Sequence, residues 1–163
     1  MFLASGLVAA TVIDLRTRRI PNALTGSMAG IGIALAATHT TGISPAASVL
    51  GFGLGMLLML PGHALGATGA GDVKLMAAVG AFVGPPLVVT AFVATAITGG
   101  VLALIVALRR GRLGTTVAGT ARLVASRGEE RSRIQSAGTA NRFAYGPAIA
   151  IGSLLAVLGQ FRG

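Results

Sequence analysis

Cysteine and tryptophan are absent from this 163-residue sequence, and histidine and aspartate occur only twice each. Without cysteine the chain can form neither disulfide bonds nor thiolate metal sites, and two histidines far apart in sequence do not favour a structural zinc site. Charged side chains are also scarce, at 10% of residues, whereas a soluble domain has about a quarter. The sequence therefore predicts no metal or other cofactor, and its composition indicates a membrane protein.

Apolar residues make up 53% of the chain and run in long blocks. The blocks show neither the alternating pattern of strands nor the one-sided pattern of soluble helices. The absence of both patterns is typical of helices that face lipid. We expect an all-α, polytopic membrane helix bundle that forms a single domain over residues 1–163, with about six transmembrane helices. The expected spans are 1–19, 23–38, 45–60, 72–84, 86–108 and 143–160.

The N-terminal span has two features of its own. It lacks the basic start of a signal peptide, so it is expected to be retained, and because it is short before Asp14 we expect a few further residues in the natural chain. Pro21 should end this span near Arg19, since the residue before a proline avoids the helical region. Asn22 is then expected to cap the next helix.

Basic residues are unevenly distributed over the connections between the expected spans. The net charge is +9, and twelve of the thirteen lysines and arginines lie after the first, third and fifth spans, with Arg162 as the exception. By the positive-inside rule these connections are cytoplasmic. The longest, about 109–142, is expected to be a cytoplasmic basic loop near anionic lipid headgroups. No nucleic-acid partner is predicted.

The two aspartates, Asp14 and Asp72, are expected at the same cytoplasmic depth of the bundle. An ionisable side chain in a membrane segment costs at least a few kcal/mol, so it indicates a function. Each aspartate also has a structural explanation. Asp14 stands four residues before Arg18, a spacing at which opposite charges pair on a helix, and Asp72 follows Gly71 at a helix start, where a carboxylate accepts backbone N–H groups.

Two carboxyl groups held close together suit the hydrolysis of a peptide bond. They do not both ionise readily, so the ionised one can act as a base toward water while the protonated one donates to the scissile carbonyl. Gly69 and Gly71 remove side-chain bulk beside Asp72, which would let an extended substrate backbone approach. The sequence does not say which aspartate begins as the acid.

Three stretches of the sequence resemble the motifs of the type IV prepilin peptidase family, a family of Gly-x-Gly-Asp intramembrane aspartyl proteases. They are "DLRTRRIPN" (14–22), "GAGDVKLMAAVGAFVG" (69–84) and "YGPAIAIG" (145–152). The resemblance covers nearly the whole chain, in the right order. It implies a membrane endopeptidase of the aspartic type.

Position by position, the resemblance implies that Asp14 and Asp72 are the catalytic residues. The residues expected to support them are Arg18, Pro21, Asn22, Gly69, Gly71, Lys74, Gly146 and Pro147. For Lys74, a topology-setting charge that reaches the membrane surface explains the residue equally well. Gly146 and Pro147 are expected to serve packing, and His63 is expected to be a loop histidine at the membrane interface.

The sequence departs from the larger members of this family, which carry a cytoplasmic insertion with paired Cys-x-x-Cys motifs and also methylate the mature pilin. Here only a few residues join the first two spans. The chain resembles the short form that serves Flp or Tad-type pili, with no methyltransferase role implied. The resemblance implies a bacterial inner-membrane enzyme that removes the short basic leader of prepilin-like proteins at the cytoplasmic face, with pilus or secretion machinery as further partners.

Two other functions are compatible with the same residues. A small proton-coupled transporter would use an intramembrane aspartate pair as a proton relay, but it would place the carboxyls near the midplane and show two related halves. A noncatalytic membrane subunit of a secretion system would keep the aspartates for assembly. No internal repeat is visible in the sequence.

Overall fold

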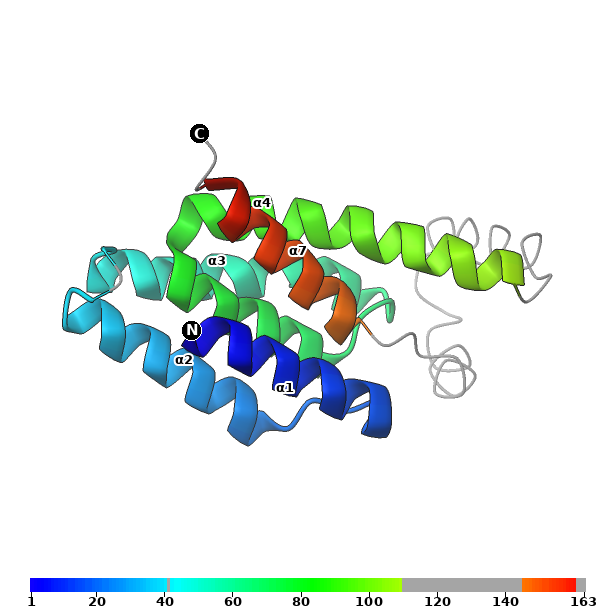
Figure 1. Ribbon diagram of the computed structural model, residues 1–163, viewed down its shortest axis with the longest axis horizontal. Helices are drawn as coiled ribbons and strands as arrows, with labels where there is room; N and C mark the ends of the chain where they lie inside the picture. Colours follow the sequence, from blue (N-terminus) through cyan, green and yellow to red (C-terminus); the bar gives the residue numbers. More distant parts are fainter. Residues whose placement is uncertain (41, 110–144, 161–163) are drawn as a thin grey trace.

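The computed structural model describes residues 1–40, 42–109 and 145–160 as a bundle of helices (Figure 1). The all-α prediction is confirmed, since these residues contain no strand. The helices are α1 (Phe2–Thr17), α2 (Asn22–Ala37), α3 (Pro45–Ala64), α4 (Ala70–Arg109) and α7 (Gly146–Gln160). The expected basic loop lies outside the described residues, apart from Arg109 at the end of α4.

The described helices carry apolar side chains on their outer faces. Leu50 on α3, Ile97 on α4 and Leu158 on α7 are 64%, 64% and 61% exposed. Within the described chain, α3 and the 70–105 stretch of α4 are long and apolar enough to cross a membrane, whereas α2 and α7 are apolar but shorter. Apolar surface on this scale is typical of a helix bundle whose solvent is lipid.

The turn between α1 and α2 is tight and differs in one detail from the prediction. Arg18 ends α1 in the left-handed conformation, with φ 52°, and its N–H donates to the Asp14 carbonyl. Pro21, rather than Asn22, occupies the cap position of α2. The predicted capping role of Asn22 is therefore wrong, because Asn22 is already helical and its side chain turns to Lys74, whose Nζ donates to Asn22 Oδ1 at 2.8 Å.

A sharp kink divides α4 into two helical arms. Gly84 has φ 76° and ψ 178°, a conformation that only glycine adopts readily, and Pro85 and Pro86 follow it. Each proline removes a backbone donor, which favours the start of a helical arm over its interior. The chain reverses direction at this point, so the second arm runs back along the bundle (Figure 1). The boundary that the sequence predicts between the spans 72–84 and 86–108 falls at this kink.

Glycines allow α3 to pack closely on the first arm of α4. A Cβ atom at Gly51 would clash with the Gly80 carbonyl, and one at Gly55 would clash with the Met76 carbonyl. The buried Ser48 hydroxyl also donates to the Ala81 carbonyl at 2.6 Å. Because lipid provides no hydrophobic driving force between helices, close packing and interhelical hydrogen bonds of this kind hold a membrane bundle together.

Several helix ends differ from the expected spans. α3 continues through Pro61 to Ala64, so His63 lies in its last turn and the prediction of a loop histidine is wrong. α4 begins at Ala70, before the expected start at Asp72. The structure brings the C-terminal end of α1 and the N-terminal ends of α4 and α7 to one end of the bundle (Figure 1).

Candidate functional site

Two cavities differ sharply in their chemistry. One, of about 650 Å³, lies beside the kink in α4, between the start of α1 and Gly84, and no acidic or basic side chain of the described residues lines it. The other, of about 40 Å³, lies at the opposite end of the bundle. Its lining residues are Asp14, Arg18, Gly66, Ala67, Thr68, Gly69 and Asp72. Both aspartates of the chain face this small cavity, which makes it the candidate functional site.

Asp14 lies in the last turn of α1 and is held by the start of α7. Its side chain is 5% exposed, and its Oδ2 accepts a hydrogen bond from the Gly146 N–H at 2.9 Å. Gly146 leaves room for this contact, since a Cβ there would lie 2.8 Å from the same oxygen. The carboxyl group thus sits at a helix N-terminus, where unpaired N–H groups and the helix dipole favour negative charge.

Asp72 lies in the first turn of α4 and is 8% exposed. Its Oδ2 accepts a hydrogen bond from the Gly69 N–H at 2.8 Å. This is half of a capping box, in which a side chain in the first turn reaches back to the N–H of the cap residue. Asp72 therefore caps its helix, as the structural explanation predicts, and faces the cavity as well.

The segment around Pro21 packs against the glycine-rich start of α4. A Cβ at Gly71 would lie 3.0 Å from the Cβ of Ile20, a buried residue. Beyond this contact, the bond between Asn22 and Lys74 joins α2 to α4. The two segments are more than fifty residues apart in sequence, and these contacts fix them side by side so that both aspartates reach one cavity.

The other predicted supporting residues have more limited roles. Arg18 lines the cavity but forms no ion pair with Asp14 within the described residues, so the pairing considered from sequence is absent there. Pro147 lies in the first turn of α7, where a missing N–H costs nothing. Gly146 and Pro147 both serve the start of this helix. His63 is exposed, and its Nδ1 donates to the Thr68 carbonyl at 3.0 Å.

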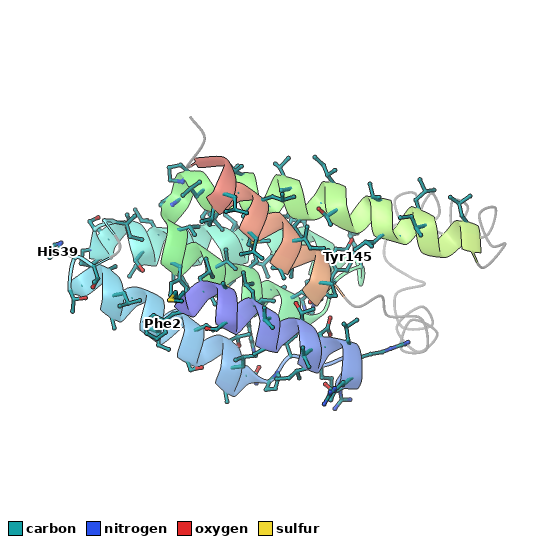
Figure 2. All side chains as sticks on the ribbon, viewed as in Figure 1. Phe2, His39 and Tyr145 are labelled. Atoms are coloured by element: carbon teal, nitrogen blue, oxygen red, sulfur yellow. The ribbon has the colours of Figure 1, made fainter. Side chains whose placement is uncertain are left out.

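Sequence reasoning missed two polar side chains at this end of the bundle. Tyr145 directly precedes α7 (Figure 2), and its ring lies against Gly99 of α4. Burial, and in addition the negative charge of Asp72, raises the pKa of Tyr145 above its ordinary value. Thr68 lines the cavity itself. The signal was present in each case, since Tyr145 is the only tyrosine and Thr68 stands inside the glycine-rich stretch.

The sequence pattern of the type IV leader peptidase family matches residues 1–104. The chain belongs to this family. The resemblance read from the sequence is thereby confirmed, and the matched segment contains both Asp14 and Asp72. Membership in the leader peptidase family makes the protein a membrane peptidase with prepilin-type substrates. A search of curated proteins and a search of solved structures each gave no match.

Proposed function

We propose that this leader peptidase is of the aspartic type and that Asp14 and Asp72 are its catalytic pair. One observation carries the proposal. The only two aspartates of the chain, one from α1 and one from α4, line the same small cavity, and each is held by a backbone N–H. Buried carboxyl groups placed together in an otherwise apolar bundle suit an acid and base pair.

In the proposed reaction the ionised carboxylate removes a proton from a water molecule as its oxygen attacks the scissile carbonyl carbon. The other carboxyl group gives its proton to the carbonyl oxygen, which forms a tetrahedral diol. The C–N bond then breaks as the first aspartate gives the proton that it took from water to the leaving nitrogen, while the second aspartate takes a proton back from a hydroxyl of the diol, which leaves a carboxylic acid and restores the starting pair. The backbone donors of Gly69 and Gly146 keep each carboxyl in place through this cycle.

In the proposed orientation the protein lies in a bacterial inner membrane, and the aspartate end of the bundle is at the cytoplasmic face. Arg16, Arg18, Arg19 and Lys74 are exposed at this end. The described connection between α2 and α3 carries no lysine or arginine. The positive-inside rule supports this assignment.

The proposed substrate is a small prepilin of the Flp or Tad type with a short basic leader. Its hydrophobic helix would dock in the membrane, so that the leader junction meets the two carboxyls at the cytoplasmic face. Only residues 18–21 join α1 to α2, which supports the short form of the family, and we propose no methyl transfer. The position of the aspartates in terminal helix turns, away from the bundle midplane, favours a peptidase over a proton transporter.

The decisive experiment replaces each aspartate by asparagine. Purified protein in lipid vesicles would be given a synthetic prepilin, and loss of leader mass would be followed by mass spectrometry. Asp14→Asn and Asp72→Asn should each reduce cleavage by on the order of 10⁴-fold, and the double variant should be no worse, because residues that act as a unit do not contribute additively. Asparagine preserves the shape of each side chain but cannot exchange a proton.

The chain offers a matched control in its only other acidic side chains, Glu129 and Glu130. Glu129→Gln and Glu130→Gln make the same chemical change within the expected basic loop, and they should leave cleavage intact. If Asp72 were only a helix cap, Asp72→Asn would retain activity, because asparagine is a good cap. Rapid cleavage by either folded asparagine variant would refute the catalytic pair.

A further inference from the structure

The start of α7 carries two neighbouring residues that reach different parts of the site. Gly146 donates its N–H to Asp14 Oδ2 at 2.9 Å. Tyr145 occupies the cap position of the helix, since its carbonyl accepts the Ile149 N–H at 3.0 Å, and Figure 2 shows it at this end of α7. The Tyr145 side chain is thus attached to the same piece of backbone that holds Asp14.

A glycine on the second arm of α4 provides a seat for the Tyr145 ring. A Cβ at Gly99 would lie 3.0 Å from Tyr145 Cε1 and 3.5 Å from its Cζ. Cζ carries the hydroxyl group and Cε1 is bonded to Cζ, so the seat contacts the hydroxyl end of the ring. A Cβ at the next residue, Gly100, would meet nothing within 4 Å. The close approach therefore belongs to Gly99, and it fixes where the Tyr145 hydroxyl lies.

The negative charge of Asp72 acts on this hydroxyl. Burial, and in addition that charge, raises the pKa of Tyr145, so the phenol keeps its proton and is a hydrogen-bond donor at neutral pH. Asp72 Oδ2 accepts the Gly69 N–H at 2.8 Å, and a carboxylate with two oxygens has room for a second donor. A carboxyl group held from one side can still turn about that bond, whereas donors from two segments fix its plane.

We propose that Tyr145 is a positioning residue for Asp72, with its ring seated on Gly99 and its hydroxyl donating to the Asp72 carboxyl group. The inference rests on the proposed aspartic peptidase function and extends it to α7, because Tyr145 then serves Asp72 as Gly146 serves Asp14. Two neighbouring residues at one helix start thereby set the relative positions of both carboxyl groups. Tyr145 exchanges no proton in the reaction; it keeps Asp72 in the orientation that proton transfer requires.

The first test removes the hydroxyl and keeps the ring. Purified Tyr145→Phe in lipid vesicles would be given a synthetic prepilin, and thermal unfolding would be measured on the same samples. We expect kcat to fall about 10-fold, within the range of a misplaced reacting group. KM should change less than about twofold, because the substrate loses no contact of its own. The melting temperature should fall only slightly, because the ring stays in its seat.

The second test displaces the ring and keeps the hydroxyl. In Gly99→Ala the Tyr145 Cε1 atom must retreat by about 0.4 Å, from 3.0 Å to ordinary van der Waals contact at 3.4 Å. We expect this shift to lower kcat about 3- to 10-fold. Gly100→Ala is the matched control, because it makes the same change at the next residue of the same helix and meets nothing within 4 Å. It should keep the wild-type kcat.

The variant that combines Gly99→Ala with Tyr145→Phe shows whether the seat acts through the hydroxyl. Residues that act as a unit do not contribute additively, so the double variant should be no slower than Tyr145→Phe, about 10-fold below wild type. Independent effects would multiply to a loss of about 30- to 100-fold. That result would show that Gly99 serves packing and does not position the hydroxyl.

Each remaining outcome counts against the inference. Wild-type kcat in Tyr145→Phe or Gly99→Ala would show that the hydroxyl does not position Asp72, and a raised KM with unchanged kcat would assign the hydroxyl to substrate binding. A variant that fails to fold would show that the contact serves stability. These results differ from failure of the proposed function. In that case the wild-type enzyme would not cleave the leader, or the asparagine variants of Asp14 and Asp72 would still do so.

Discussion

Replacing Gly146 by alanine tests whether the start of α7 holds Asp14 in a working position. Gly146 donates its N–H to Asp14 Oδ2 at 2.9 Å. An alanine Cβ would lie 2.8 Å from that oxygen, 3.0 Å from the Asp14 Cβ and 3.2 Å from its Cγ. The added atom meets the Asp14 Cβ as well as its Cγ and Oδ2, so a rotation of the side chain alone does not relieve the clash.

The size of the effect follows from these distances. Ordinary van der Waals contact begins at 3.4 Å, so the carboxyl oxygen must retreat by about 0.6 Å from its 2.8 Å separation. A similar lengthening of the hydrogen bond between the Gly146 N–H and Asp14 Oδ2 takes it to the edge of the usual donor–acceptor distances. A misplacement approaching 1 Å costs up to about 100-fold in rate. We therefore expect cleavage to fall about 10- to 100-fold and the free energy of unfolding to fall by about 1–3 kcal/mol.

The assay is leader cleavage by purified protein in lipid vesicles, with thermal unfolding measured on the same samples. Gly159→Ala is the matched control, because Gly159 lies in the same helix and an added Cβ there meets nothing within 4 Å. It should leave cleavage unchanged. Cleavage at the wild-type rate by Gly146→Ala would refute the idea that this close contact positions Asp14.

Two further predictions concern electrostatics and topology. The chain has one tyrosine and no tryptophan, so ultraviolet absorbance during an alkaline titration reports Tyr145 alone; its midpoint should lie above the ordinary tyrosine value and should fall in Asp72→Asn, because one cause of the raised pKa is then removed. An unchanged midpoint in that variant would show that Asp72 does not act on Tyr145. Because natural cysteine is absent, single cysteines at the exposed Thr17 and Thr40 can be labelled cleanly, and they should react from opposite sides of the membrane, with Thr17 cytoplasmic. Reaction of both from one side would contradict the proposed orientation.

Much of the fold could be predicted because lipid imposes simple constraints on sequence. A span must be long and apolar, so blocks of apolar residues revealed the helices, and Gly84 with its two prolines marked a break. The aspartates were visible for the same reason, since an acidic residue is rare and costly in such a chain. Charge distribution then predicted a common depth for both, and the shared cavity agrees with it.

The details that failed depend on contacts between distant segments or on local compensation. Asn22 looked like a helix cap, but its side chain is used by Lys74, 52 residues further along the chain. Pro61 looked like the end of a span, yet α3 continues past it, because neighbouring groups in a bundle tolerate a proline within a helix. Thr68 stood in the glycine-rich stretch, but its place in one cavity with Asp14 depends on how α1 packs against α4.

The contact between Asp14 and Gly146 makes the last described helix part of the site, although it lies beyond the family match at residues 1–104. Within the described residues no arginine forms an ion pair with Asp14, and its carboxylate accepts a hydrogen bond from the first N–H of α7. Loss of either partner leaves a buried polar group unpaired, at a cost of about 1–3 kcal/mol. Docking of α7 and retention of a carboxyl at residue 14 therefore stabilise each other. Asp14→Leu has no acceptor for the Gly146 N–H, so α7 should dock less tightly and a structural defect should accompany the loss of activity. In Asp14→Asn the same structural defect should be much weaker.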